Sequence, residues 1–179
     1  MSGRRHIFQT LIGLATLLLS GVALTGCALP VATDQDPAVV YLVRHAEKQL
    51  GNDPGLTADG QARAEDLVEA LADARIDVIY STDFQRTRDT AAPIALRRNL
   101  PIIFYDAGDL EGFAAKLRSD GRSALVVGHS NTTPGLVAAL GGDAGLPITE
   151  ATEYDRLYRL VLGAETSSTI SRFGIPTPR

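Results

Sequence analysis

From residue 38 onward, short apolar runs alternate with longer amphipathic stretches. Runs rich in β-branched residues predict strands at 39–43, 76–80, 102–105 and 125–127. The stretches between them have helical periodicity and predict helices at about 57–74, 83–98 and 110–118, with another helix after Asn131. Strands that alternate with helices in this way favour a mostly parallel sheet covered on both faces. The expected fold class is therefore α/β, a three-layer αβα sandwich.

Local signals refine both ends of this pattern. Thr57 is placed to cap the first helix, and Asp59 would lie in the positive first turn of that helix. Near the C-terminus, segments 154–162 and 168–173 flank the turn-like sequence Gly163-Ala164-Glu165. This arrangement predicts a hairpin, or a late antiparallel pair of strands, at an edge of the sheet.

The first 26 residues read as an export signal rather than as part of the fold. Arg4 and Arg5 precede a mostly apolar stretch at 7–22, and small residues follow before Cys27. Polar residues interrupt the apolar stretch, which disfavours a membrane-spanning anchor helix. Ordinary signal cleavage and export through the twin-arginine route both stay open, the latter because of the paired arginines.

The quartet Leu24-Thr25-Gly26-Cys27 resembles the bacterial lipobox, in which the cysteine is lipidated and becomes the first residue of the mature protein. We therefore expect a lipoprotein-type signal at 1–26, a tether at 27–37 that contains two prolines, and one domain at 38–175. The expected location is the bacterial cell envelope, with the exported domain tethered to a membrane through a lipid on Cys27.

Composition narrows the possibilities further. Cys27 is the only cysteine, so the domain has no internal disulfide and depends on its apolar core. The chain has 17 Lys and Arg against 21 Asp and Glu, and the signal segment contributes two of the arginines and no acidic residue. The remaining residues are thus mildly acidic, which argues against a nucleic-acid partner.

Histidines stand where two of the apolar runs end. Arg44 and His45 follow the first predicted strand, and His129 follows the fourth through Gly128. Parallel sheets in α/β folds place their ligand crevice at the carboxyl ends of the strands, so both imidazoles are expected at one mouth. Taken alone, each segment also fits an ordinary polar loop.

An arginine and a glycine turn indicate that this mouth holds an anion. Arg86 falls within about the first turn of its helix if Thr82 or Asp83 is the cap, where acidic residues are usually preferred. After His129, the start of the next helix would point backbone amides outward, with Ser130 among the nearby donors. Arg88 is expected to be a solvated neighbour.

The segments LVRHAEK, LTADGQARAEDL, YSTDFQRTRDTAAPI and VVGHSNT, in this order, resemble the successive signatures of the histidine phosphatase superfamily, also called the phosphoglycerate mutase-like family. The resemblance covers about residues 39–140. It implies that His45 is the nucleophile of a phosphomonoester hydrolase, forming a phosphohistidine. Arg44, Arg86 and His129 would clamp the phosphate, with Ser130 as a further substrate contact, and no metal or cofactor is needed.

Charge and substrate expectations follow from the resemblance. The guanidinium groups should favour the neutral, nucleophilic form of His45. The substrate would be a phosphorylated small molecule or a phosphoprotein. The short stretch between Glu47 and Leu56 leaves no room for a large lid, so the chain resembles the small phosphatase members, including those that act on phosphohistidine, more than the mutases.

The general acid is the least defined role. Relatives place an acidic residue after the third strand, which favours Asp106, then Asp109, although Asp109 is also placed to cap a helix. Glu47 is a third candidate because it lies two residues after His45.

Other interpretations of the same residues remain. The sequence GHSNT could be a degraded nucleophile elbow with Ser130 as nucleophile, but it lacks the second glycine and a downstream histidine. His45, His129 and a carboxylate could form a metal site, but Arg44 and Arg86 would then lie beside the cation. The non-enzymatic alternative is a phosphate-binding or scaffold lipoprotein of the same fold.

Overall fold

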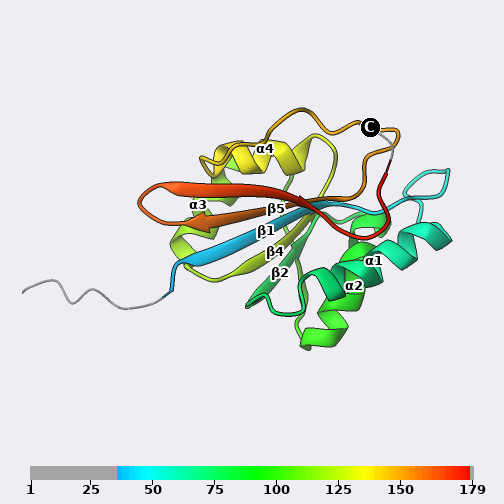
Figure 1. The fold of residues 1–179 in the computed structure, drawn as a ribbon, viewed down its shortest axis with the longest axis horizontal. Coiled ribbons are helices and arrows are strands. Elements are labelled where there is room, and N and C mark those ends of the chain that lie inside the picture. Colours follow the sequence, from blue (N-terminus) through cyan, green and yellow to red (C-terminus); the bar gives the residue numbers. More distant parts are fainter. Residues whose placement is uncertain (1–35, 178–179) are drawn as a thin grey trace, which may run out of the picture. The chain divides into compact units, whose positions relative to one another are not determined.

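The computed structural model describes residues 36–177 and shows one mixed six-stranded sheet flanked by helices (Figure 1). The expected signal peptide, Cys27 and most of the expected tether lie outside the described residues. The sheet has the order β3-β2-β4-β1-β5-β6. Its strands are β1 (Ala38–Arg44), β2 (Val78–Ser81), β3 (Ile102–Phe104), β4 (Ala124–Gly128), β5 (Arg156–Leu162) and β6 (Thr166–Arg172).

The sheet is parallel over four strands and antiparallel over the last two. β1 and β2 both pair in parallel with β4, and β3 pairs in parallel with β2. β5 runs antiparallel to β1, and β6 antiparallel to β5. The predicted parallel sheet with an antiparallel C-terminal edge is confirmed.

Two pairs of helices cover the two faces of the sheet (Figure 1). Leu67 and Ile94, from the first and second helices, pack with Val127 on one face, while Leu117 and Leu136, from the third and fourth, belong to the core on the other. The predicted three-layer sandwich is thus confirmed. The helices are α1 (Ala58–Ala70), α2 (Gln85–Arg98), α3 (Leu110–Asp120) and α4 (Thr132–Ala139).

Helix ends follow the predictions in part. Thr57 caps α1, because its side chain accepts a hydrogen bond from the Gly60 amide. α2 begins at Gln85 after Phe84, whose own side chain makes no capping hydrogen bond, rather than after Thr82 or Asp83. Arg86 nevertheless lies in the first turn of α2, as predicted.

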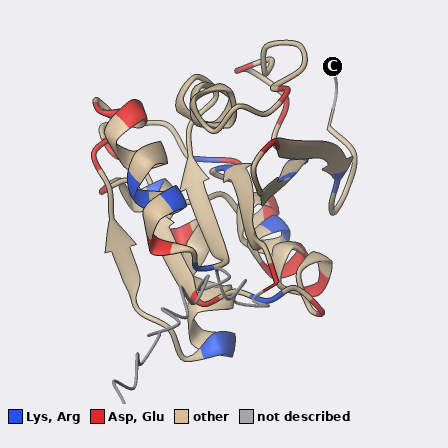
Figure 2. Ribbon diagram, turned by 90° about the vertical axis from the view of Figure 1, so that its left-hand side faces the viewer, with Lys and Arg blue, Asp and Glu red and all other residues tan. Residues whose placement is uncertain are grey.

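Charged side chains lie mainly on helices and loops, while most positions of the strands are uncharged (Figure 2). An exception is a buried ion-pair cluster beside β5. The Glu153 carboxylate accepts hydrogen bonds from Arg156 and Arg172 at 2.6 Å, and Arg172 also binds Asp155 at 2.6 Å. Because Glu153 and Asp155 are 3% and 1% exposed, this cluster fixes the segment that enters β5.

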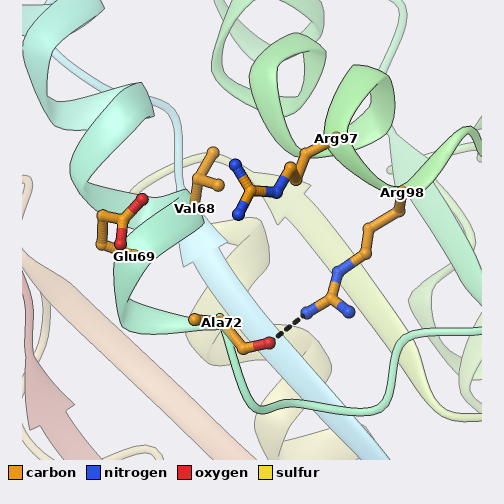
Figure 3. A pocket seen from close by; sticks show the side chains of 5 residues that line it. All are labelled: Val68, Glu69, Ala72, Arg97 and Arg98. Atoms are coloured by element: carbon orange, nitrogen blue, oxygen red, sulfur yellow. Dashed lines mark hydrogen bonds between the residues drawn. The ribbon is translucent and has the colours of Figure 1, made fainter.

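A pocket lies between α1 and α2, lined in part by Arg97 and Arg98 (Figure 3). Arg98 donates hydrogen bonds to the carbonyl oxygens of Leu71, Ala72 and Ala74, so its guanidinium satisfies the backbone after the end of α1. This pocket contains none of the predicted site residues. No helix among residues 36–177 is long and apolar enough to cross a membrane.

The first turn of α1 packs closely on the chain that follows β1. The Thr57 amide donates to Glu47 O at 2.9 Å, and a Cβ at Gly60 would lie 2.1 Å from the same carbonyl oxygen. Glycine is therefore required at residue 60 for this approach, which places α1 against the segment carrying His45.

We predict that Gly60→Ala lowers the free energy of unfolding by about 1–3 kcal/mol, since the added methyl group forces the helix away from a backbone carbonyl. Urea denaturation of both proteins measures the difference. Gln61→Ala, at an exposed neighbouring position of the same helix, is the matched control and should change the midpoint little. Equal stability of Gly60→Ala and the wild type would contradict the close approach.

Candidate active site

The carboxyl ends of β1 and β4 bring the two histidine segments together. Arg44 and Gly128 are paired at the ends of these parallel strands, and the His45 amide donates to Gly128 O at 2.9 Å. The rings of His45 and His129 lie 5.5 Å apart, centroid to centroid. The predicted convergence of both imidazoles is therefore present in the structure.

Gly128 is needed where β4 ends because other side chains crowd its α-carbon. A Cβ there would lie 2.8 Å from Tyr105 Oη, 2.9 Å from Thr133 Oγ1 and 3.0 Å from Thr132 Oγ1. Glycine at residue 128 thus leaves room for three hydroxyl groups close to the backbone that precedes His129.

One ring nitrogen of His45 is hydrogen-bonded to the backbone. Its Nδ1 lies 2.8 Å from Ala46 O, and a carbonyl can only accept, so Nδ1 carries the proton and Nε2 keeps its lone pair. The residue is 3% exposed. Burial, followed by the charges of Arg44, His129 and Arg86, lowers the pKa of His45 to about 3. The imidazole is therefore neutral at physiological pH, with Nε2 available as a nucleophile.

A chain of hydroxyl groups sets the proton on His129. Thr87 Oγ1 donates to Thr82 O and Phe84 O, at 2.8 and 2.9 Å, and accepts from Thr82 Oγ1 at 3.0 Å. The Thr82 hydroxyl, having donated its proton, accepts from His129 Nε2 at 2.9 Å. His129 Nδ1 is thus left as an acceptor, 3.5 Å from an Arg86 nitrogen.

The pKa of His129 is lowered to about 4, first by burial and then by the charges of Arg86 and Arg44. Both arginines therefore act on both imidazoles. The expectation that guanidinium groups favour neutral histidines has the correct direction, but burial is the larger cause at each ring.

Two contacts, one with a carbonyl oxygen and one with an aromatic ring, hold Arg44. The residue is 2% exposed, and NH1 donates to Glu153 O at 2.9 Å. Its guanidinium lies over the Tyr154 ring, with Cζ 4.0 Å from the centroid. Arg44 Nε is buried without a hydrogen-bond partner among the described residues. The buried ion-pair cluster of Glu153 and Asp155 therefore holds in place the segment that positions Arg44.

Arg86 has a similar arrangement on the opposite side of the imidazole pair. Its Cζ lies 4.5 Å from the centroid of the Phe84 ring, and NH1 lies 3.6 Å from Asp53 Oδ1. Asp53 also accepts a hydrogen bond from the Gln85 amide at 2.8 Å, so it caps α2 from a distant loop. Arg86 Nε is likewise buried without a partner in the described part of the chain.

Phe84, Tyr154, Thr82 and Asp53 were not identified from the sequence. Their roles depend on contacts between segments far apart in the chain, and no local pattern marks them. For Phe84, the available signal was its position two residues before Arg86.

The three predicted acids are engaged elsewhere. Asp106 accepts a hydrogen bond from the Gly108 amide and lines a pocket beside β3 and α3, and Asp109 caps α3 through the Gly112 amide. Glu47 forms a two-pronged ion pair with Arg63, with contacts of 2.7–3.0 Å. No hydrogen bond or ion pair joins any of these carboxylates to the two histidines or to Arg44 and Arg86 in residues 36–177.

Ser130 is half-buried between His129 and the start of α4. Its predicted role in substrate binding stays a prediction. Within residues 36–177, no group of three histidine, cysteine, aspartate or glutamate side chains is placed to hold a metal ion. The site presents the guanidinium groups of Arg44 and Arg86 and two imidazoles to a ligand.

We predict that the stability of the domain falls between pH 6.5 and pH 4.5. In this range the unfolded chain protonates both histidines near their ordinary pKa of 6.5, whereas the folded chain keeps them neutral. The unfolded state then binds more protons, so the free energy of unfolding decreases as pH falls, by at most about 1.4 kcal/mol per pH unit for each histidine.

Urea denaturation across this range measures the slope, and His129→Asn should make it shallower. Carboxylates titrate alike in both proteins and cancel from the difference. Parallel pH profiles for the wild type and the variant would contradict the lowered pKa of His129.

Comparisons with known proteins agree with this geometry. Residues 40–107 match the family model of the histidine phosphatase superfamily (branch 1). Phosphoserine phosphatase 1 of Hydrogenobacter thermophilus is 40% identical over 75 residues, which cover 37% of this chain and 36% of that protein. The matching region spans only 35–36% of the length of the curated relatives.

Solved structures match over a larger part of the chain. A SixA protein from Agrobacterium tumefaciens is 26% identical, with a TM-score of 0.55, over 79% of this chain and 100% of that chain. The protein histidine phosphatase SixA complexed with tungstate has a TM-score of 0.59 at 18% identity, over 75% of this chain and 95% of that chain, and shares the fold. Residues 40–107 are thus similar to the histidine phosphatase superfamily, and the domain shares its fold with the SixA protein from Agrobacterium tumefaciens.

Proposed function

We propose that this protein is a phosphomonoester hydrolase that acts through a phosphohistidine at His45. The observation that carries the proposal is the meeting of two neutral imidazoles with two guanidinium groups, each with a buried Nε that has no partner within residues 36–177. Buried donors without partners are costly, and a tetrahedral oxyanion would satisfy several of them at once.

The first chemical step uses the free nitrogen of His45. The Nε2 lone pair attacks phosphorus, the P–O bond to the leaving group breaks, and the leaving oxygen takes the bonding electrons. The hydrogen bond from Nδ1 to Ala46 O keeps the ring oriented and stabilises the positive charge that the ring acquires. Water then attacks phosphorus, the N–P bond breaks, and inorganic phosphate and neutral His45 are formed.

Arg44, Arg86 and His129 would hold the nonbridging oxygens. Arginine provides paired donors that suit a phosphate, and Arg44 and Arg86 face the imidazole pair from opposite sides. His129 presents Nδ1, which needs a second proton before it can donate to an oxygen. A bound dianion favours that protonated form, so His129 would take up a proton when phosphate binds.

The comparisons support phosphatase chemistry. One relative is a phosphoserine phosphatase, and one structural neighbour is a protein histidine phosphatase that binds tungstate, an oxyanion of similar shape to phosphate. On this basis the substrate is a phosphorylated small molecule or a phosphoprotein. The predicted acid, Asp106, would have to leave its hydrogen bond with Gly108 to protonate a leaving group.

We also propose that the protein is exported to the cell envelope and anchored to a membrane by a lipid on Cys27. The support is the sequence Leu24-Thr25-Gly26-Cys27 behind an apolar segment. The alternative function is a phosphate-binding or scaffold lipoprotein of the same fold that does not turn over substrate.

We predict that hydrolysis of phenyl phosphate by the full-length protein is abolished in His45→Ala and falls at least about 100-fold in Arg86→Ala, as expected for loss of a preorganised donor. Phosphate release measures the rates. When the reaction is quenched without acid, phosphorus NMR should detect the phosphoramidate of phosphohistidine in the wild type. The signal should be absent from His45→Ala.

Arg88→Ala is the matched control, since Arg88 is on the same helix and forms an ion pair with Asp83. It should retain close to wild-type activity. Equal turnover by wild type and His45→Ala would reject the nucleophile. Binding of tungstate without any hydrolysis would favour the non-catalytic alternative.

A further inference from the structure

Two aromatic rings flank the imidazole pair. The Phe84 ring lies 5.2 Å from His129 and the Tyr154 ring 6.1 Å from His45, centroid to centroid. With the 5.5 Å between the histidines, these contacts link four rings in the order Phe84, His129, His45 and Tyr154, which we call the row. The apolar members stand at the two ends of the row.

Each apolar ring is covered on one side by an arginine of the candidate clamp. Arg86 Cζ lies over Phe84 and Arg44 Cζ over Tyr154, at 4.5 and 4.0 Å from the centroids. Each arginine of the candidate clamp therefore has an aromatic ring as its direct neighbour. Phe84 remains 42% exposed despite these contacts, so part of its ring is free to meet a ligand.

The contacts of the acidic residues also favour an aromatic leaving group. The Glu47, Asp106 and Asp109 carboxylates are held by Arg63, Gly108 and Gly112 respectively. A leaving group that departs as a phenolate has little need of them, because a phenol has a pKa of about 10, whereas that of water is about 15.7 and ordinary alcohols are similarly weak acids.

We propose that the substrates of this site are phosphomonoesters of aromatic alcohols, whose ring stacks on Phe84 and lies near Tyr154. The inference rests on the proposed phosphatase function and adds the class of leaving group. In the reaction the P–O bond breaks as His45 Nε2 bonds to phosphorus, and the electron pair leaves on the aryl oxygen. Stacking on Phe84 stabilises the bound substrate and the transition state alike. Its loss should therefore raise KM and leave kcat nearly unchanged.

The test compares two phosphate esters in the full-length protein. Phenyl phosphate carries the ring, while 2,2,2-trifluoroethyl phosphate releases an unusually acidic alcohol without a ring. We expect Phe84→Leu to lower kcat/KM for phenyl phosphate about 3- to 10-fold, the value of one aromatic contact, mainly through KM. The value for trifluoroethyl phosphate should fall less than the value for phenyl phosphate, because leucine removes the contact with Arg86 for both esters but the contact with a substrate ring only for phenyl phosphate.

Phe104→Leu is the matched control, because Phe104 is an exposed aromatic residue, 52% accessible, on edge strand β3. It should leave both rates unchanged. Tyr154→Leu tests the other end of the row and should reproduce the selective loss.

The possible outcomes separate this proposal from the proposed function. Equal losses on both esters in Phe84→Leu would show that Phe84 only positions Arg86 and would overturn the aromatic preference. Unchanged rates on both esters would overturn it as well. Hydrolysis of both esters that depends on His45 but not on Phe84 would leave the phosphatase function standing. Absence of any hydrolysis by the wild type would overturn both.

Discussion

Buried positive charge is the constraint on which the site depends. Arg44 is almost fully buried and Arg86 largely so, and both act on the same two imidazoles. A guanidinium stays charged when buried, and its charge disfavours a second positive charge on a neighbouring imidazole. The histidines therefore remain neutral. Burial is the larger cause of that neutrality, and the same charges that suit the site for an anion lower the pKa of His45 further.

Aromatic rings and oxygen atoms support these arginines. Tyr154 and Glu153 O hold Arg44, and Phe84 and Asp53 hold Arg86. In each case an aromatic face and one oxygen fix the guanidinium but leave Nε free. This arrangement orients both groups before a ligand arrives, which reduces the reorganisation needed during phosphoryl transfer.

Much of this arrangement could be predicted from the sequence because it follows from strand order. His45 and His129 each follow a buried apolar run, and parallel strands place such residues at one edge. The contributions of Tyr154 and Thr82 could not be predicted, because each depends on a contact with a distant segment of the chain. Phe84 is close to Arg86 in the chain, but nothing in the local sequence marks its ring as a partner of that arginine. Asp53 caps a helix that begins 32 residues later, a distance over which no capping pattern operates. Asp106 stays a prediction as the general acid, and one of its carboxylate oxygens accepts a hydrogen bond from the Gly108 amide.

The ion pairs of Glu153 also have a consequence for the order of folding. Arg172 on β6 secures Glu153, whose carbonyl oxygen in turn holds Arg44 at the end of the first strand. Residues 38–129 contain both histidines and both arginines of the candidate site, yet the support for Arg44 is complete only when the last strand of the sheet is in place. The candidate anion site therefore forms fully only after β6 has joined the sheet.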